Sequence, residues 1–175
     1  MKLSIIKAVP GHFAQLQQIE LAAFAGLLAE GAVTGCASAT DDAGLTRYLE
    51  ADALYVAEAD GEQIVGFCGG YLQDNWLHIA EMDVHPDWQR RGIGRMLMKT
   101  MLQRVKESHL QGASLTTDRR VPFNAPFYQS LGFRILGQAE CPQRLRRLLD
   151  AEISAGFDPA RRVAMLISAD EINGE

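Results

Sequence analysis

The chain has 175 residues, of which 47% are apolar and 22% charged, so it is long enough to bury a substantial core as one domain over residues 1–175. Its formal net charge of −5 argues against a nucleic-acid-binding protein, because such proteins usually carry a basic surplus. No stretch approaches the ~20 apolar residues of a membrane-spanning helix. We therefore expect neither a nucleic acid nor a membrane as a partner.

The three cysteines, Cys36, Cys68 and Cys141, lie far apart and form no CxxC pair. The sequence therefore shows neither a zinc knuckle nor a dithiol motif, and we expect no metal. The apolar run after Met1 is too short for a signal peptide. Together with the odd cysteine count, this predicts a protein of the reducing cytoplasm.

The first predicted elements are a strand over residues 3–8 and a helix over residues 10 to about 25. The helix is indicated by Phe13, Leu16 and Ile19, which recur at a spacing of three residues. Residues 26–40 are rich in Gly and Ala, and both a mobile loop and a short second helix fit them. A helix capped by Thr40, Asp41 or Asp42 is expected to end near residue 51.

Three strands follow in the middle of the chain, over residues 54–59, 63–72 and 76–84. The first two are joined by Asp60-Gly61, a strong signal for a tight hairpin turn. The next turn is Asp74-Asn75, and Pro86 ends the third strand because proline cannot donate to a ladder. The three strands are expected to form an antiparallel meander.

Helices and strands alternate in the remainder of the chain. An apolar stripe at steps of four, beginning at Ile93 and Leu97, predicts a helix over residues 93–105 that faces a sheet. Strands are expected over residues 113–117, 133–136 and 163–168. A short helix over residues 125–131 is ended by Gly132, and residues 143–155 form a further amphipathic helix.

The most informative stretch is Gln89-Arg90-Arg91-Gly92-Ile93-Gly94-Arg95, at the junction of a strand with a helix. Glycines let the backbone approach a ligand closely, and the first turn of a helix has unpaired N–H groups and a partial positive charge. The arginines add donors that stay protonated near neutral pH. The junction therefore predicts a site for a phosphate group.

The chain resembles the GNAT superfamily of acetyl-CoA-dependent N-acetyltransferases in three features. Gln89-x-x-Gly92-x-Gly94 matches the family's Q/R-x-x-G-x-G/A acyl-CoA motif. The stretch from Glu81 to Pro86 resembles the family's central strand, and Phe127-Tyr128-x-x-x-Gly132-Phe133 resembles its late helix and strand. The resemblance covers residues 3 to 168. It implies an α+β fold (an α/β sandwich), with a central, mostly antiparallel mixed sheet of about seven strands flanked by helices.

The resemblance also implies acetyl-CoA as cosubstrate. The loop from Arg90 to Arg95, with Gln89 just before it, is expected to hold the pyrophosphate. Met82 and Val84 are expected to pair with the pantetheine arm. A Rossmann-type nucleotide site is disfavoured, because the glycine loop follows meander strands and no acidic ribose partner lies in the expected place.

Acyl transfer needs a group that accepts the proton of the amine and a group that protonates the leaving thiolate. By resemblance Tyr128 is the acid, since a phenol is protonated at neutral pH. Glu81 is the first candidate for the base and Asp83 the second. These two share a face of the strand unless a bulge intervenes. His78 and His85 are further candidates, because imidazole titrates in the right range.

One position departs from the family pattern. Many relatives have an Asn seven residues before the helix tyrosine, where this chain has Val121. Asn124 either takes over that contact with the cofactor or caps its helix, and the two roles are compatible.

The helix over residues 143–155 also departs from the shortest family pattern. We expect Arg144, Arg146 and Arg147 on its solvated side, and its apolar stripe either covers the sheet or forms a homodimer contact. In this fold the acceptor pocket is framed by residues 24–34, Tyr71, Trp76 and residues near Phe123.

The leading hypothesis is an N-acetyltransferase that acts on a primary amine by direct attack in a ternary complex. The amine is a small metabolite, an antibiotic, or a peptide or protein amine. None of the cysteines lies in the three motifs, so a covalent cysteine intermediate is not indicated. The alternative is a sensor or partner-binding module that binds acyl-CoA with little catalysis.

Overall fold

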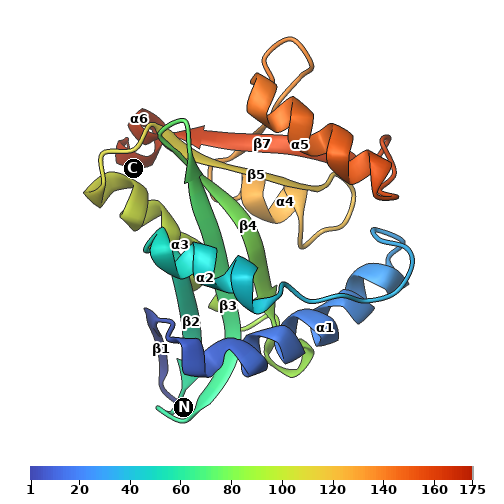
Figure 1. Ribbon diagram of the computed structural model, residues 1–175. Coiled ribbons are helices and arrows are strands. Elements are labelled where there is room, and N and C mark those ends of the chain that lie inside the picture. The colour runs from blue at the N-terminus through green and yellow to red at the C-terminus, as the bar shows by residue number, and fades with distance from the viewer. Residues whose placement is uncertain (175) are drawn as a thin grey trace.

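The computed structural model describes residues 1–174. Figure 1 shows a twisted sheet with helices on both of its faces. The elements, in chain order, are β1 (Leu3–Lys7), η1 (Pro10–His12), α1 (Phe13–Ala29), α2 (Asp42–Glu50), β2 (Leu54–Ala59), β3 (Gln63–Gln73), β4 (Trp76–Val84), η2 (Pro86–Trp88), α3 (Ile93–Glu107), β5 (Gly112–Asp118), α4 (Ala125–Gln129), β6 (Arg134–Ile135), α5 (Gln143–Ser154), β7 (Arg162–Ser168) and α6 (Ala169–Asn173).

The seven strands form one sheet in the order β1-β2-β3-β4-β5-β7-β6. Strands β1 to β4 are an antiparallel meander, β5, β7 and β6 pair antiparallel, and β4 pairs parallel with β5. The predicted mixed, mostly antiparallel sheet flanked by helices is confirmed.

Two segments differ in detail from the sequence-based expectation. Helix α1 continues to Ala29, because Leu27 and Leu28 extend its apolar pattern, and no second helix forms before α2. Asp41 is the N-cap of α2, and its carboxylate accepts a hydrogen bond from Gly44 N at 2.8 Å. Helix α6 was not expected, although Ser168 and Glu171 form the capping box that starts it.

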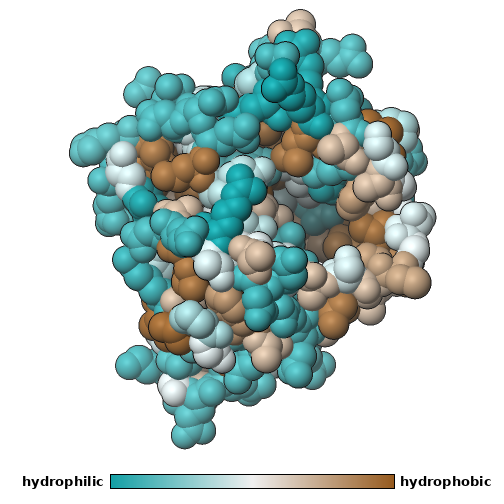
Figure 2. Space-filling view, in the orientation of Figure 1, coloured by the Kyte–Doolittle hydropathy of each residue, from teal (hydrophilic) through white to brown (hydrophobic). Residues whose placement is uncertain are grey.

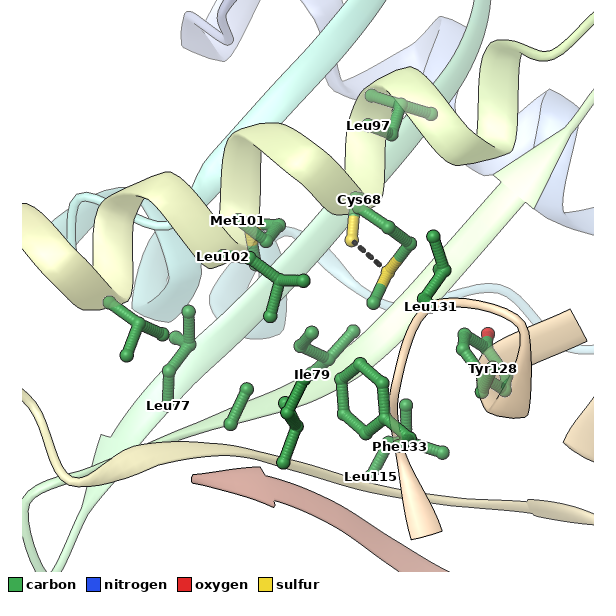
Figure 3. Packing of buried hydrophobic residues seen from close by; sticks show 14 of the residues in the cluster. Cys68, Leu77, Ile79, Leu97, Met101, Leu102, Leu115, Tyr128, Leu131 and Phe133 are labelled. Atoms are coloured by element: carbon green, nitrogen blue, oxygen red, sulfur yellow. Dashed lines mark hydrogen bonds between the residues drawn. The ribbon is translucent and has the colours of Figure 1, made fainter. Parts of the chain in front are cut away.

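Apolar side chains divide into layers on the two faces of the sheet. Helix α3 covers one face through Leu97, Met98 and Met101, which are fully buried. Helices α1 and α2 cover the opposite face through residues such as Leu16 and Leu45. Figure 3 shows the α3 layer, with the Cys68 thiol 4.0 Å from the Met98 sulfur and Tyr128 near Phe133 at one end.

Strands β4 and β5 separate soon after they meet. They pair only at Trp76–His78, opposite Gly112–Ser114. Beyond this short seam, residues 79–84 of β4 pair with β3 alone. Figure 1 shows β5 and β7 running across the molecule while β4 turns away from them. One edge of β4 is therefore open inside the sheet, where its backbone groups are available to a ligand.

A β-bulge shapes this open half of β4. Gly69 pairs with Glu81 and Gly70 with Ile79, so Ala80 is the extra residue. A Cβ on Gly70 would lie 2.4 Å from the His78 carbonyl oxygen, which explains the glycine at this position. Ile79 and Met82 face the α3 layer, and Ala80 faces the α1 and α2 layer. The bulge thus brings His78, Glu81 and Asp83 to one face.

No helix within residues 1–174 is long and apolar enough to cross a membrane.

Candidate active site

The loop that precedes α3 has the geometry of an anion site. Gly92 is the N-cap of α3 with φ +78°, and Arg90 also has a positive φ, +62°. These conformations turn the chain so that helix α3 begins at Ile93. None of the amides from Arg90 to Arg95 donates a hydrogen bond to another group of residues 1–174. Unpaired N–H groups at the N-terminus of a fifteen-residue helix favour a phosphate oxygen.

The charged side chains of this loop are exposed, and two of them are already oriented. Arg91 lies over the Trp88 ring and donates to the Asp87 carbonyl at 3.2 Å. Arg95 donates to Ser130 Oγ at 2.8 Å, which ties the start of α3 to the end of α4. The Gln89 amide donates to the Val84 carbonyl at 3.1 Å, so it connects the loop to β4.

Met82 and Val84 lie on the open edge of β4. The amide of His85 donates to Val65 on β3. Because hydrogen-bonding directions alternate along a strand, the backbone groups of Met82 and Val84 point away from β3, toward the gap before β5. An extended ligand lying here would reach the loop at one end and the bulge at the other.

A cavity of about 460 Å³ opens beside the bulge. Its floor is formed by β4 and β5, and its walls by the end of α1, the segment after α1, and α5. Figure 2 shows the hollow, with apolar residues on the side formed by α1 and the following segment. Apolar lining residues are Phe24, Leu27, Ala32, Val33, Leu148 and Phe157, and acidic ones are Glu20, Glu81, Asp83, Asp118 and Glu152.

The surroundings of three of these carboxyl groups raise their pKa values. Burial raises the pKa of Glu81 well above its usual range, and the neighbouring Asp83 adds to the rise. Burial, with a contribution from Glu20, raises the pKa of Asp83 to about 8. Burial also raises the pKa of Glu20, against hydrogen bonds from Thr40. Carboxyls with raised pKa values in a cavity are candidates for proton transfer.

The other two acidic groups are neutralised by arginines. Asp118 accepts from Arg161 at 2.7 Å. Burial alone raises its pKa, but the bonds from Arg161 and from two backbone amides outweigh burial and keep the pKa below its ordinary value. Glu152 pairs with Arg162 at 2.9 Å. Of the five acidic residues that line the cavity, Glu20, Glu81 and Asp83 have no basic partner within residues 1–174.

Tyr128 lies on α4, buried between Phe127 and Phe133, with ring centroids 5.2 Å and 6.0 Å away. Burial raises the pKa of its phenol above the ordinary value of 10, and the thiol of Cys68 and the carboxyls of Asp83 and Glu81 add to the rise. The phenol therefore stays protonated across the physiological range. Its hydroxyl donates to no group in the described part of the chain, so its proton is available to a ligand.

Asn124 occupies the N-cap position of α4, but its side chain makes no capping hydrogen bond there. The side chain lines the cavity instead. The expected frame of the cavity is only partly right. Tyr71, several residues of the range 24–34 and Asn124, the neighbour of Phe123, line it, whereas Trp76 and Phe123 themselves do not. Phe123 is 47% exposed, and Trp76 packs on the apolar cluster beneath α5.

Two side chains behave differently from the sequence-based expectation. Arg144 is not on a solvated face: its Nη1 donates to the buried Ser114 Oγ at 2.8 Å, and its Nη2 is buried without a partner in residues 1–174. His78 is unsuited to act as a base. Its burial, together with the charge of Arg144, lowers the pKa of its imidazole to about 3.

Sequence reasoning missed Glu20, Phe157 and the Glu152–Arg162 pair. Glu20 lies on the inner side of α1, among apolar neighbours, where one acidic residue gives no motif. Phe157 comes from the segment after α5 and Arg162 from the start of β7, and Arg162 lies over the Phe157 ring at 4.3 Å. The sequence offered one signal for this part of the cavity: Glu20 and Glu152 are acidic residues beside the apolar stripes of the helices that became α1 and α5.

Comparison with known proteins supports the assignment of the fold and the family. Residues 50–135, which contain β2 to β6, match the family model described as an acetyltransferase (GNAT) domain. The fold resembles that of the ribosomal-protein-S18-alanine N-acetyltransferase from Escherichia coli, with a TM-score of 0.68 and 16% identity over 96% of this chain and 94% of that one.

Two further similar structures contain a bound cofactor. YncA from Salmonella typhimurium, a putative acetyltransferase with acetyl-CoA, has a TM-score of 0.70 and 16% identity over 97% of this chain and 95% of that one. PaiA N-acetyltransferase from Thermoplasma acidophilum, in complex with coenzyme A, has a TM-score of 0.69 and 15% identity over 96% and 99%. The matched segment, the sheet and the glycine loop agree with one another, and together they support a GNAT acetyltransferase domain that acts as an acyltransferase.

Proposed function

We propose that the chain transfers an acetyl group from acetyl-CoA to a primary amine by direct attack in a ternary complex. One observation carries this proposal. The open edge of β4 connects a loop of free amides at Gly92 with a cavity that contains Glu81 and Asp83. A cosubstrate with a diphosphate, an extended arm and a reactive end needs these three regions in this order.

The residues of the loop and the strand fit acetyl-CoA. The amides from Arg90 to Arg95, with Ile93 and Gly94 at the first helical turn, would hold the diphosphate, and Arg90 and Arg91 would add charge-assisted hydrogen bonds. A Cβ on Gly92 would meet nothing within 4 Å, so the surface above the loop is open to a ligand. Met82 and Val84 would pair with the arm, and Asn124 would contact the cofactor from α4. When bound, acetyl-CoA supplies a thioester carbonyl for the amine to attack.

Glu81 is the proposed base. The amine nitrogen must lose a proton as it forms its bond to the acyl carbon, and Glu81 lies next to the bulge where the open edge meets the cavity. Asp83 is two residues further along the same face and keeps the pKa of Glu81 raised. A carboxylate with a raised pKa is a stronger base than an ordinary one, which suits it to accept the proton of the amine.

Tyr128 is the proposed acid. As the carbon–sulfur bond breaks, the electron pair stays on sulfur and the Tyr128 hydroxyl donates its proton there. Tyr128 is buried beside the glycine-loop helix through Phe127, and its proton has no competing acceptor in the described residues. A phenol that remains protonated is a suitable donor to a thiolate.

The experiment is calorimetric titration of CoA into the purified chain, followed by a screen of amines for acetyl-CoA-dependent thiol release. We expect CoA binding and release with at least one amine. Absence of heat on titration would overturn the proposal. CoA binding with no transfer to any small amine, peptide N-terminus or lysine side chain would favour the sensor alternative.

A further inference from the structure

A buried histidine of β4 lines the same cavity as the proposed base. His78 is only 3% exposed, and its ring lines the cavity. Its Nδ1 lies 3.1 Å from Ser114 Oγ. Its Nε2 has no partner within residues 1–174, and it is not among the fully enclosed polar atoms that lack one. The unpartnered nitrogen of a deeply buried side chain therefore faces the open space of the cavity.

The neighbours of His78 determine which of its nitrogens carries the proton. Arg144 can only donate, so Ser114 Oγ accepts from Arg144 Nη1 at 2.8 Å. The single hydrogen of this fully buried hydroxyl needs an acceptor, and the Nδ1 of His78 is the acceptor within reach. We therefore assign the proton of His78 to Nε2, the nitrogen that faces the cavity.

The electrostatic surroundings of His78 favour a ligand oxygen. Burial, and then the charges of Arg144, Arg47 and Arg162, keep the imidazole neutral by lowering its pKa to about 3. Arg47 lies 3.7 Å above the ring of Tyr71, whose centroid is 5.1 Å from that of His78. The surroundings that disfavour a positive charge on the ring stabilise a partly or fully negative ligand atom that accepts from its N–H.

The position of His78 relative to the carboxyls limits the shape of the ligand. His78 and Glu81 are three residues apart on β4, which corresponds to at most about 10 Å at ~3.3 Å per residue. Simple alternation would place them on opposite faces, but the bulge at Ala80 brings both to the cavity. The same cavity has an apolar wall that includes Phe24, Leu27 and Val33.

We propose that His78, through its Nε2–H, binds a carbonyl-type oxygen of the acceptor, an amide or a carboxylate, that lies several bonds from the reacting amine. The inference rests on the proposed function and specifies its substrate class: an amine with an apolar middle and an sp² oxygen at its far end. Ser114 and Arg144 are positioning residues, since they fix the tautomer of His78.

Three amines with the same number of non-hydrogen atoms along the chain test the proposal. They are 5-aminopentanoate, 5-aminopentanamide and n-hexylamine, which has a methyl group in place of the oxygen. We expect a kcat/KM at least about tenfold higher for one or both of the oxygen-bearing amines, because n-hexylamine leaves a buried donor unpaired. The ratio to follow is kcat/KM for the oxygen-bearing amine divided by kcat/KM for n-hexylamine. In His78→Leu this ratio should fall toward one, mainly because KM for the oxygen-bearing amine rises. His78→Gln, which keeps an N–H at this place, should restore part of it, and Ser114→Ala should give an intermediate ratio.

The ratio within each variant does not depend on how much protein is folded. His109→Asn changes an exposed histidine at the end of α3 and should keep the ratio of the unmodified chain. Equal turnover of the three amines, or an unchanged ratio in His78→Leu, would overturn this inference alone. Absence of thiol release with every amine would overturn the proposed function, and this inference with it.

A second readout needs no turnover. In a ¹⁵N imidazole spectrum assigned with His78→Gln, His78 should show a protonated Nε2 and a bare Nδ1 from about pH 5 to about pH 8. A protonated Nδ1 would overturn the assignment.

Discussion

The loop before α3 and the cavity beside β4 are the two ends of one path, and they are built in opposite ways. The loop is exposed, and it offers backbone donors and the arginines Arg90 and Arg91. The cavity is a recess lined by side-chain carboxyls such as Glu81 and Asp83, whose charged forms are disfavoured by burial. The loop depends on backbone conformation and the cavity on ionisation, so the two ends should respond differently to mutation and to pH.

We expect the largest effect at the cavity. Replacement of the proposed base by Glu81→Gln should lower kcat by about 10²- to 10⁴-fold, because the amine then loses its proton acceptor. CoA affinity, measured by calorimetry, should change little. Glu58→Gln, on β2 away from the cavity, is the matched control. A kcat for Glu81→Gln close to that of the control would remove Glu81 from the mechanism.

Tyr128, on α4, is the proposed acid, and its replacement should lower the rate less than that of Glu81. We expect Tyr128→Phe to lower kcat by about 10²-fold, since the phenylalanine ring keeps the packing and loses only the proton donor. Steady-state rates with a fixed amine measure the effect. Tyr55→Phe removes another buried tyrosine hydroxyl, on β2, and should retain the rate. Equal rates for both variants would assign Tyr128 to packing alone.

The loop should respond through cosubstrate affinity. Gly92 has φ +78°, which costs a non-glycine residue about 1–2 kcal/mol, so Gly92→Val should weaken CoA binding about tenfold or more as the loop shifts. Gly61, in the hairpin turn, has the same φ and also has nothing within 4 Å of its Cβ position. Gly61→Val therefore carries a similar strain without touching the loop. Equal CoA affinities in the two variants would exclude the loop as the CoA site.

The smallest effects should appear in pH profiles. Asp83 raises the pKa of Glu81, so Asp83→Asn should shift the acid limb of kcat to lower pH. The folded pKa of Asp83 is about 8 against an ordinary 3.8, so the native state keeps a proton that the unfolded chain has lost. Stability should therefore fall as pH rises from about 4 to about 8, and Asp83→Asn should flatten that slope in thermal melts.

Asp118 provides the contrast for this measurement. Its folded pKa is lowered, so its contribution to stability is present above its unfolded pKa and is lost as pH falls through the folded pKa. Asp118→Asn should therefore destabilise the chain at neutral pH, whereas Asp83→Asn should not. If both variants lowered the melting temperature at neutral pH, the assigned protonation states of Asp118 and Asp83 would be wrong.

Much of the fold could be predicted because its signals are local. The Asp60-Gly61 turn, the α3 stripe beginning at Ile93 and the glycine loop each lie within a short stretch of sequence. The end of α1 was missed because Gly26 interrupts a helix that Leu27 and Leu28 continue. The short helix α6 was missed because its capping box follows directly on a strand.

The cavity was less predictable, because segments far apart in the sequence build it. Glu20 from α1 and Phe157 from the segment after α5 meet residues of β4 only in the folded chain. The face of His78 depends on the bulge at Ala80, and no residue of β4 indicates a bulge by itself. The inward turn of Arg144 depends on Ser114, thirty residues away.

The short seam between β4 and β5 has a mechanical consequence. Within residues 1–174, strand pairing joins the β1–β4 part of the sheet to the β5–β7 part only at Trp76–His78. An extended molecule lying in the gap would therefore add contacts between the two parts. Filling the gap should slow the exchange of amide hydrogens at Met82 and Val84, and it should raise the melting temperature with ligand concentration. The sheet thus leaves one strand position unfilled, and an extended cosubstrate bound there would fill it.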